Sequence, residues 1–364
     1  MGVAIATQAA HYLHFCKKED ESLRKSRITF ICGNAREEMD MFRSFYSSFF
    51  EIQSSIFRDF VNGDGSEEII FPTYFFGNDA NFLDIEFEFI NGESYHPKVR
   101  DYLRKLANDP NRRISIFIST GNDRRDINIG MSLPEELYYQ KNREIIPIFV
   151  HQKKSGELLS LLHTLSNEKY KKIYPFGMID TVLDIIPKNL LRAQLLNLSY
   201  SNDWNENYDD KKLAQLANDK WDELDPALQW SSIYCANSNE LKLKEFKLTY
   251  VDNNSLVDFI SADKNLIKLC EIEQNRWNVE KLLMGFRKPN KNEQEKIDGN
   301  WEEEFVIFNK RYIHDLIRPY DQLTNEKWTH GIKAKKEVAA TNIKMINNIP
   351  RIERIVSREM EDKG

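Results

Sequence analysis

The residues with the clearest chemical potential gather on one predicted helix in the last third of the chain. Glu273, Trp277 and Glu280 recur at spacings of four and three residues, so they share one helix face, and Arg276 borders that face. A helix that only fills a core carries leucines along such a stripe. Carboxylates beside a tryptophan and an arginine must instead be paired internally or face a partly wet cavity.

Two interpretations of this stripe are open from the sequence. In the first, the glutamates and Arg276 form an internal ion pair that holds the helices together, as many buried pairs do. In the second, Trp277 stacks on a planar ligand while Arg276 and Glu273 supply polar contacts. His314 and Arg318 could then lie across from the stripe. Taken alone, His314 is more often a satisfied interior histidine than a ligand group.

The rest of the sequence carries none of the common catalytic signatures. No Ser-His-Asp or Cys-His spacing marks a nucleophile, and neither G-x-S-x-G nor G-x-x-x-x-G-K-[ST] occurs. The four cysteines form no CxxC pair and have no metal-ligand spacing with histidine. The alternating Asp84, Glu86 and Glu88 could hold a cation, although such a run is more often a solvated face or a sheet edge. We therefore predict no catalytic residue, no metal site and reduced, structural thiols.

The elements that position these residues change in character along the chain. Strands are predicted over 27–32, 85–90, 114–119 and 145–150, and helices over 37–50, 97–107, 123–141 and 158–165. Such alternation implies an α/β fold, with a parallel sheet wrapped by helices in a Rossmann-like arrangement. After about residue 188 helical patterns dominate. The predicted organisation is an N-terminal segment at 1–26, a Rossmann-like domain at 27–198, a helical lead-in at 199–265 and an all-helical domain at 266–364.

The turn after the first strand departs from a dinucleotide-binding fingerprint. In G-x-G-x-x-G the glycines let backbone amides and a helix N-terminus approach a pyrophosphate. Residues 33–38 read GNAREE, so only Gly33 remains of the three glycines. Ala35 partly blocks close backbone approach, and Glu37 and Glu38 repel an anionic ligand where a phosphate would sit. The sequence therefore predicts weak NAD binding or none.

The order of strands still resembles the nucleotide-binding lobe of TrkA-type bacterial potassium-uptake regulators over about 27–165. The resemblance rests on that order, on residues 90–93 (INGE) and on residues 119–123 (STGND). Because ligands of such folds bind at the strand ends, it implies a nucleotide site near Gly33, Asn91 and Thr120. The alternative is a degenerate scaffold or dimerisation platform without a cofactor.

Two stretches of the last third resemble the signatures of bacterial ryanodine-receptor-type (RyR) domains. Residues 269–287 (LCEIEQNRWNVEKLLMGFR) resemble the first, an E-x-x-R-W helix that ends in a glycine–aromatic step. Residues 312–323 (YIHDLIRPYDQL) look like the second, H-x-x-L-x-P-[YFW]-x-x-L. The ligand-binding residues that we predict from the stripe and this resemblance are Glu273, Arg276, Trp277, Glu280, His314, Arg318 and Tyr320. Residues 326–341 (EKWTHGIKAKKEVAAT) depart from the family's charged helix, so contacts made there by an arginine are not transferred.

The overall charge and hydropathy narrow the class of function. A formal net charge of -6 argues against a broad nucleic-acid surface. The absence of any stretch of about 18 apolar residues predicts a chain without a transmembrane segment, which we expect to be cytoplasmic.

From these features we expect a ligand-sensing regulatory protein that binds a nucleotide-type small molecule through its RyR-like domain and forms a homo-oligomer. The resemblance implies relatives among regulatory and ion-channel proteins and among suspected nucleotide-signal sensors in defence against phage. The alternatives are a nucleotide-processing Rossmann enzyme that is regulated by the C-terminal part, and the cytoplasmic gating part of an ion channel.

Overall fold

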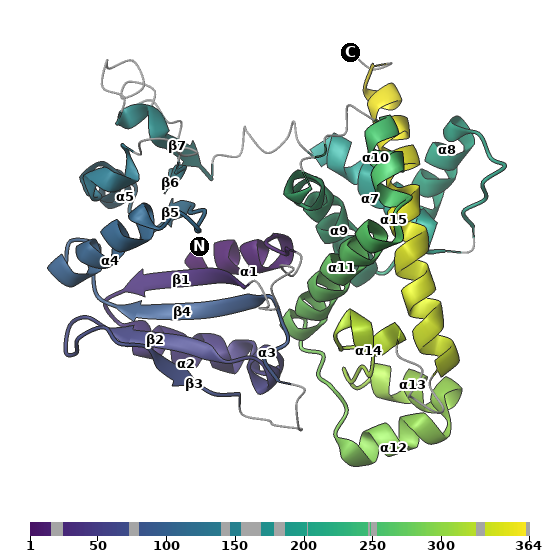
Figure 1. The fold of residues 1–364 in the computed structure, drawn as a ribbon, viewed down its shortest axis with the longest axis horizontal. Helices are drawn as coiled ribbons and strands as arrows, with labels where there is room; N and C mark the ends of the chain where they lie inside the picture. Colours follow the sequence, from purple (N-terminus) through teal and green to yellow (C-terminus); the bar gives the residue numbers. More distant parts are fainter. Residues whose placement is uncertain are drawn as a thin grey trace.

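The computed structural model places an α/β part beside a helical part (Figure 1). The residues it describes are 1–15, 25–72, 80–139, 146–153, 169–177, 186–201, 203–246, 248, 253–324 and 332–361.

The first sheet has four strands in the order β1-β4-β2-β3. Their bounds are β1 Ser26–Cys32, β2 Ser55–Asp59, β3 Glu68–Ile70 and β4 Ile85–Asn91. β4 runs parallel to both β1 and β2, whereas β3 is antiparallel to β2 and forms an edge. The parallel strands confirm the predicted α/β class. In a dinucleotide-binding unit the second strand lies beside the first, but here β4 lies between β1 and β2.

A second, parallel sheet follows with the order β5-β6-β7. Its strands are β5 Ile116–Ile118, β6 Ile148–His151 and β7 Ile173–Phe176. The expected single sheet is therefore divided into two among the described residues. Ile90 of the first sheet and Ile118 and Ile148 of the second share one buried cluster with Val99, which lies on the helix α4 Pro97–Asn108. The two sheets thus share a hydrophobic core.

The helices of the α/β part follow their apolar periodicity. They are α1 Gly2–Tyr12, α2 Ala35–Phe45, α3 Ser47–Ile52, α4 and α5 Asp123–Ser132. On α2, Phe42 is buried, with its ring centroid 4.9 Å from that of Phe87 in β4. The predicted helix over 37–50 is interrupted at Tyr46, where the backbone leaves helical geometry. The predicted helix over 123–141 ends at Ser132, shortly before Pro134, because the residue before a proline disfavours helix.

The α/β part also contains two short 3-10 turns. The 3-10 turns are η1 Glu135–Leu137 and η2 Tyr170–Lys172. The predicted helix over 158–165 lies outside the described residues.

The helical part occupies the rest of the chain. Its helices are α7 Ile186–Tyr200, α8 Asp210–Trp221, α9 Pro226–Glu245, α10 Asn253–Ile260, α11 Asp263–Leu283, α12 Lys291–Gly299, α13 Trp301–Asn309, α14 Tyr320–Thr324 and α15 Ile332–Glu361. Among the described residues from 186 onward, β pairing is limited to a single bridge between Arg287 and Ile313. Helices therefore dominate here, as predicted. No helix in the described part of the chain is both long and apolar enough to cross a membrane.

The helix α7 packs inside the helical part, against α8, α9 and α15. Its Ala193, Leu195 and Leu196 are fully buried in the same cluster as Met345 and Ile352 of α15. The boundary predicted at residue 198 therefore falls near the end of a helix whose side chains belong to the helical core.

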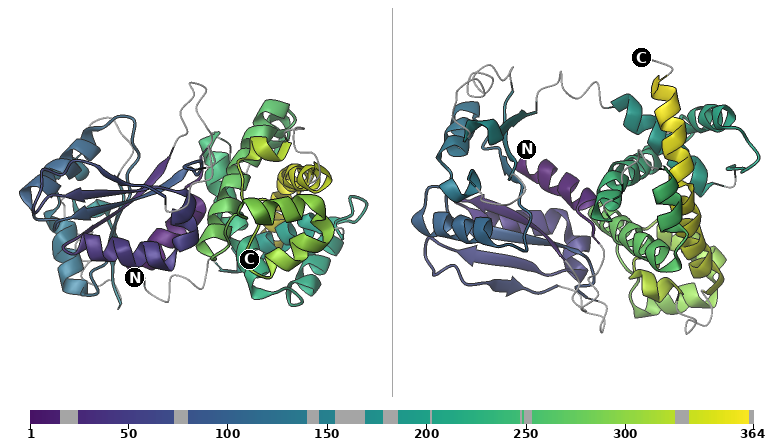
Figure 2. Two further views of the ribbon diagram at one scale, coloured as in Figure 1. Left: turned by 90° about the horizontal axis from the view of Figure 1, so that it is seen from below. Right: turned by 45° about the horizontal axis from the view of Figure 1, so that its top comes forward.

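The helix α1 connects the two parts of the molecule. It contacts β1, α9 and α11, and the right view of Figure 2 shows it running along the sheet toward the helical part. Ala6 and Ala10 of α1 are buried in one cluster with Phe49 of α3 and with Val279 and Leu282 of α11. The hydrophobic core is therefore continuous across the interface.

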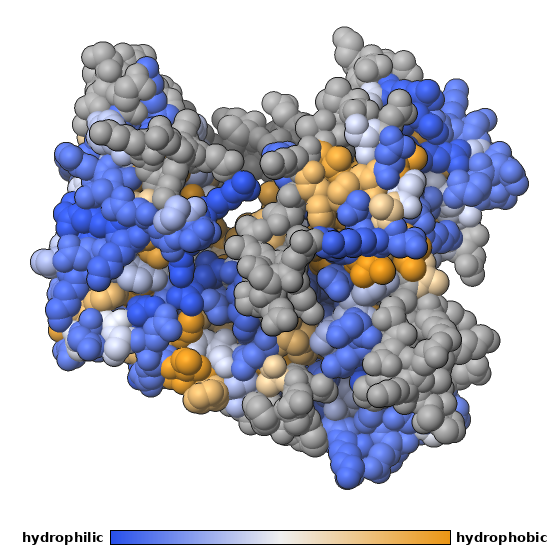
Figure 3. Space-filling model, viewed as in Figure 1, coloured by the Kyte–Doolittle hydropathy of each residue, from blue (hydrophilic) through white to orange (hydrophobic). Residues whose placement is uncertain are grey.

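The face of the α/β part shown in Figure 3 is largely hydrophilic, with an apolar area over the edge strand β3. Ile69 in β3 and Phe71 just after it are 50% and 68% exposed. Arg36 of α2 pairs with Glu68 of β3 at 2.6 Å, so α2 lies beside this edge. Phe45 at the end of α2 is 76% exposed. Exposed apolar side chains thus border the free edge of the sheet.

Candidate functional site

The carboxyl ends of β1, β4 and β2 border a cavity of about 400 Å³, which we call the crevice. Its lining residues are Gly33, Asn34, Arg36, Glu37, Phe57, Asp59, Asn62 and Asn91. α/β folds commonly bind ligands at the carboxyl ends of their parallel strands. Two of the three residues predicted for a cofactor site, Gly33 and Asn91, lie in this lining.

The carboxylate of Asp59 is fixed at the end of β2. Its Oδ1 accepts hydrogen bonds from the backbone N–H groups of Val61 and Asn62, both at 2.9 Å, and from Nδ2 of Asn91 at 3.0 Å. These bonds, led by the one from the Asn62 N–H, lower the pKa of Asp59 below its ordinary value, so the group is ionised at neutral pH. Oδ2 receives one long bond of 3.4 Å from the Asn62 side chain. It therefore retains capacity to accept a hydrogen bond from a ligand.

The sequence analysis did not identify Asp59 as a candidate site residue, because it did not predict the strand β2 that ends at Asp59. The five residues of β2 read SIFRD, in which two charged residues follow a short apolar run. The sequence signal that could have indicated this strand was the turn-rich stretch at 62–66, which begins shortly after the strand ends.

The surroundings of the crevice are acidic, as the sequence predicted for the first turn of α2. Glu37 and Glu38 both lie in that turn. A carboxylate oxygen of Glu93 would lie 3.2 Å from a Cβ atom placed on Gly33. The nearby cations are already paired: Arg36 with Glu68, and Arg125 with Glu93 at 3.1 Å. A polyphosphate would therefore meet net negative charge.

The third predicted cofactor residue, Thr120, is engaged within its own loop. Its backbone N–H and its hydroxyl donate to Oδ1 of Asp126 at 2.7 Å and 2.6 Å. These bonds fix the turn between β5 and α5. Thr120 is not among the residues that line the crevice.

The charged stripe on α11 forms a buried ion network that we call the Arg276 hub. Nε and Nη2 of Arg276 donate to Oε1 of Glu273 at 2.9 Å and 2.7 Å, and Nη1 donates to Oε2 of Glu280 at 2.5 Å. Lys242 of α9 pairs with the other oxygen of Glu273, and the hydroxyl of Tyr200 donates to Oε1 at 3.3 Å.

The side chains of the hub are fully buried, and their charges compensate one another. The three residues of α11 in the hub, Glu273, Arg276 and Glu280, are at most 1% exposed. Burial opposes ionisation of Glu273, but Arg276 and Lys242 outweigh burial and lower the pKa of Glu273 to about 2. The first interpretation of the stripe, internal pairing, accounts for Glu273, Arg276 and Glu280. Contact of these residues with a ligand stays a prediction.

Trp277 and His314 do meet, within an aromatic cluster. The His314 ring packs edge-on against Trp277 with centroids 4.8 Å apart, and against Phe305 at 5.0 Å. Trp277 is half-buried, and the ammonium of Lys281 lies 5.7 Å from the centre of its ring. Burial, with a smaller contribution from Lys281, lowers the pKa of His314 to about 3, so its imidazole is neutral at physiological pH.

The last two predicted ligand residues pack inside the helical part. Arg318 is 2% exposed; its Nε donates to the Asp315 carbonyl, and its Nη2 donates to the Gln294 side chain. Tyr320 belongs to the core cluster of the helical part, together with Cys270. The structure thus ties both residues into packing rather than leaving them exposed.

The acidic run before and within β4 proved to be neither a cation site nor a solvated face. Glu88 is fully buried and accepts hydrogen bonds from Arg58 and Thr29, both at 2.8 Å, and from Tyr102 at 2.9 Å. Arg27 also reaches it, at 3.2 Å. This face of the sheet is covered by protein. The two arginines, rather than a bound cation or water, therefore compensate the negative charge of Glu88. Among the described residues, no group of three histidines, cysteines or carboxylates could hold a metal ion.

The cysteines that the structure describes are free thiols, as predicted. These are Cys32, Cys235 and Cys270, whereas Cys16 lies outside the described residues. Burial, assisted by Glu273, raises the pKa of Cys235 to about 12. A thiol with so high a pKa is a poor nucleophile at neutral pH.

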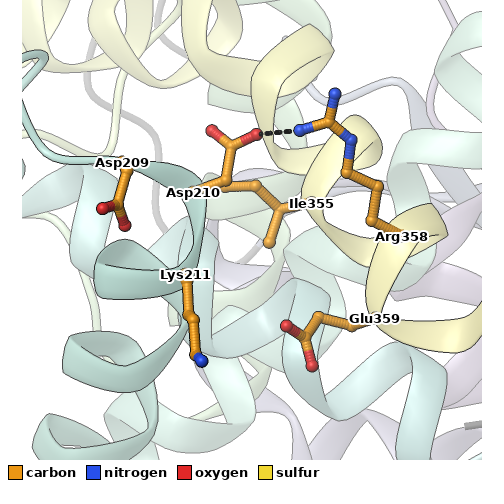
Figure 4. A pocket seen from close by; sticks show the side chains of 6 residues that line it. All are labelled: Asp209, Asp210, Lys211, Ile355, Arg358 and Glu359. Atoms are coloured by element: carbon orange, nitrogen blue, oxygen red, sulfur yellow. Dashed lines mark hydrogen bonds and ion pairs between the residues drawn. The ribbon is translucent and has the colours of Figure 1, made fainter. Parts of the chain in front are cut away.

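A larger cavity of about 560 Å³ lies between α8 and α15, where Arg358 reaches across to Asp210 (Figure 4). Its lining residues are Asp209, Asp210, Lys211, Ile355, Arg358 and Glu359. Asp210 also pairs with Arg351 and Arg354, both at 3.2 Å. The carboxylate of Asp210 is already paired with three arginines, so we attribute this cavity to the packing of α8 against α15.

No family model, curated protein or solved structure matches the chain at a significant level. The RyR-type and TrkA-type resemblances therefore rest on the motifs quoted above.

Proposed function

We propose that this protein is a ligand-sensing regulator and that its receptor site is the crevice of the α/β part. The observation that carries the proposal is the ionised carboxylate of Asp59, held rigidly beside the amides of Asn34, Asn62 and Asn91 in a cavity of about 400 Å³. Cavities of roughly 300–1,000 Å³ with a few fixed polar groups are typical small-molecule sites.

The chemistry of the lining indicates the class of ligand. Asp59 and Glu37 favour hydroxyl or ammonium donors, and the Phe57 ring, which also lines the crevice, is covered by the guanidinium of Arg36 at 4.0 Å. The ligand is therefore a polar, uncharged or cationic molecule of nucleoside type, rather than a polyphosphate.

We expect nucleosides to bind the crevice and NAD to bind weakly or not at all. Asp59→Asn should weaken nucleoside binding about tenfold or more, because a hydrogen bond to a charged group contributes about 1.5–3 kcal/mol. Adenosine, other nucleosides, AMP and NAD would be compared by thermal shift and calorimetry on the full chain.

The matched control for this experiment is Asp64→Asn. Asp64 caps the nearby Ser66 N–H at 2.9 Å but does not line the crevice. Micromolar NAD binding would contradict the proposed ligand class. Equal nucleoside affinity of the Asp59 variant and the wild type would contradict the proposed site.

A second candidate site for the same function is the half-buried face of Trp277. The observation that favours it is the Lys281 ammonium beside the ring, which could meet a phosphate while Trp277 stacks on a base.

Replacing Trp277 with alanine is expected to lower the affinity for a nucleotide at this second site by tenfold or more. Loss of a stacking aromatic costs roughly 1–3 kcal/mol per base. Calorimetry with AMP and cyclic nucleotides would measure the change, with Trp230→Ala as control because Trp230 is 53% exposed on α9. A folded Trp277 variant with unchanged affinity would remove this site from consideration.

Regulation through assembly is part of the proposal. The protein is predicted to form a homo-oligomer, and the exposed apolar residues beside β3 offer a surface that association could cover.

A further inference from the structure

The helix α1 is held in place by aromatic and polar contacts at its carboxyl end. The ring of His11 stacks on that of Tyr234 in α9, with centroids 3.9 Å apart and an interplanar angle of 7°. The hydroxyl of Tyr12 accepts a hydrogen bond of 3.0 Å from the side chain of Asn237, also in α9. These contacts attach α1 to the helical part.

The segment after α1 is attached to the sheet instead. His14 Nδ1 lies 2.8 Å from Asp84 Oδ1, directly before β4, and both side chains are almost fully buried. The segment from His11 to His14 therefore contacts both parts of the molecule. We call this region the junction.

Docking at the junction leaves polar groups unsatisfied. Among the described residues, no hydrogen-bond partner exists for Nδ1 of His11, Nε2 of His14 or Oδ2 of Asp84, and the three side chains are 5%, 1% and 0% exposed. Each group gives up its hydrogen bonds to water when α1 docks and gains no replacement, which weakens docking. The junction therefore carries a polar desolvation cost that opposes the docking of α1.

The charges that face His11 oppose its protonation. Burial is the largest effect, followed by the guanidinium of Arg276 on α11 and by His14; together they lower the pKa of His11 to about 3. On the α9 side, His11 faces the neutral ring of Tyr234.

The carboxylates around the junction are already committed to other partners. Glu273 and Glu280 on α11 pair with Arg276, and they pair further with Lys242 and Lys281, respectively. Asp84 is engaged by His14, whose Nδ1 lies 2.8 Å from its Oδ1. His11 is therefore the group whose protonation is incompatible with the docked helix.

We propose that α1 is a proton-sensitive latch: protonation of His11 releases α1 from α9 and α11 and loosens the connection between the α/β and helical parts. The released histidine regains contact with water and is separated from Arg276. This inference does not depend on the crevice being a ligand site.

The latch can be tested by hydrogen exchange of the full chain. The released His11 titrates at its ordinary value of 6.5 and the docked one at about 3, so the equilibrium constant for release should rise about 30-fold between pH 7.5 and pH 5. Protection of the amides in residues 3–12, corrected for the pH dependence of intrinsic exchange, would report this change. Amides of α4, in the core between the two sheets, serve as the internal reference.

Two substitutions distinguish His11 from other titrating groups. His11→Phe keeps a ring against Tyr234 and His11→Gln keeps a polar group, and neither can take up a proton near neutral pH. Both are expected to make the protection of α1 independent of pH, whereas His314→Gln should leave the response of α1 intact because His314 lies in the Trp277 cluster. If the corrected protection of the α1 amides in the wild type did not change with pH, the proposal would be overturned, even if both His11 variants failed to dock α1. The proposal would also be overturned if the protection of α1 in the His11→Phe variant fell with pH as much as in the wild type.

Discussion

Replacing Arg276 with methionine is expected to lower the free energy of unfolding by about 3–5 kcal/mol. The reason is that Glu273 and Glu280 would keep their charges inside the helical core after losing their shared partner; both are fully buried. Lys242 would still pair with Glu273, and Lys281 lies 3.6 Å from Glu280, so a value near the lower end is expected. Urea unfolding followed by circular dichroism and tryptophan fluorescence would measure the change.

Arg354→Met provides the matched control for the Arg276 variant. Arg354 also pairs with a carboxylate, Asp210, but its side chain is 45% exposed, and Asp210 keeps Arg351 and Arg358. Exposed pairs contribute about 0–1 kcal/mol, so this variant should unfold almost like the wild type. Equal losses in the two variants would show that the Arg276 hub is hydrated rather than sealed in the core.

Lowering the pH from 7 to 5 is expected to reduce the unfolding free energy by about 4 kcal/mol through two histidines. His11 and His314 both have a pKa of about 3 in the folded chain, against an ordinary value of 6.5. Between these values the unfolded chain binds more protons than the folded chain. The contribution of these two histidines to the unfolding free energy is therefore fully present above pH 6.5 and is lost progressively as the pH falls toward 3. Each histidine accounts for about 2 kcal/mol at pH 5.

The histidine contribution is measured by urea unfolding at pH 7, 6 and 5, in the wild type and in a His11→Phe, His314→Gln double variant. The double variant is expected to lose about 4 kcal/mol less than the wild type over this range. If the unfolding free energy fell equally with pH in the two proteins, the acid sensitivity would arise from other groups.

The sequence predicted the elements whose side chains repeat regularly. The strands β1, β4, β5 and β6 contain apolar runs, and α4 has a clear amphipathic period. The strands β2, β3 and β7 were missed because they are short and contain charges or a proline. Pairing with β4 makes β2 a strand, and this partner lies outside any local sequence window. Asp59 of the crevice was missed for the same reason.

The candidate sites were predicted only as far as local spacing allows. The three- and four-residue spacings of Glu273, Arg276 and Glu280 correctly placed these residues together, because such spacings hold along any helix. Lys242, which completes the hub, belongs to another helix, and only tertiary packing brings it there. Gly33 and Asn91 were predicted from strand ends and do line the crevice, whereas Thr120 bonds to its own loop.

The long sequence separation across the junction has a consequence for synthesis of the chain. Tyr12 and its partner Asn237 are 225 residues apart. At a ribosomal rate of about 5–20 residues per second, α1 waits roughly 10–45 s before its binding surface on α9 exists. The small apolar residues Ala6 and Ala10, which are buried in the finished protein, have no partner in the helical part during that interval. This helix is synthesised well before the part of the chain that it contacts, so it can reach its final position only after α9 has emerged.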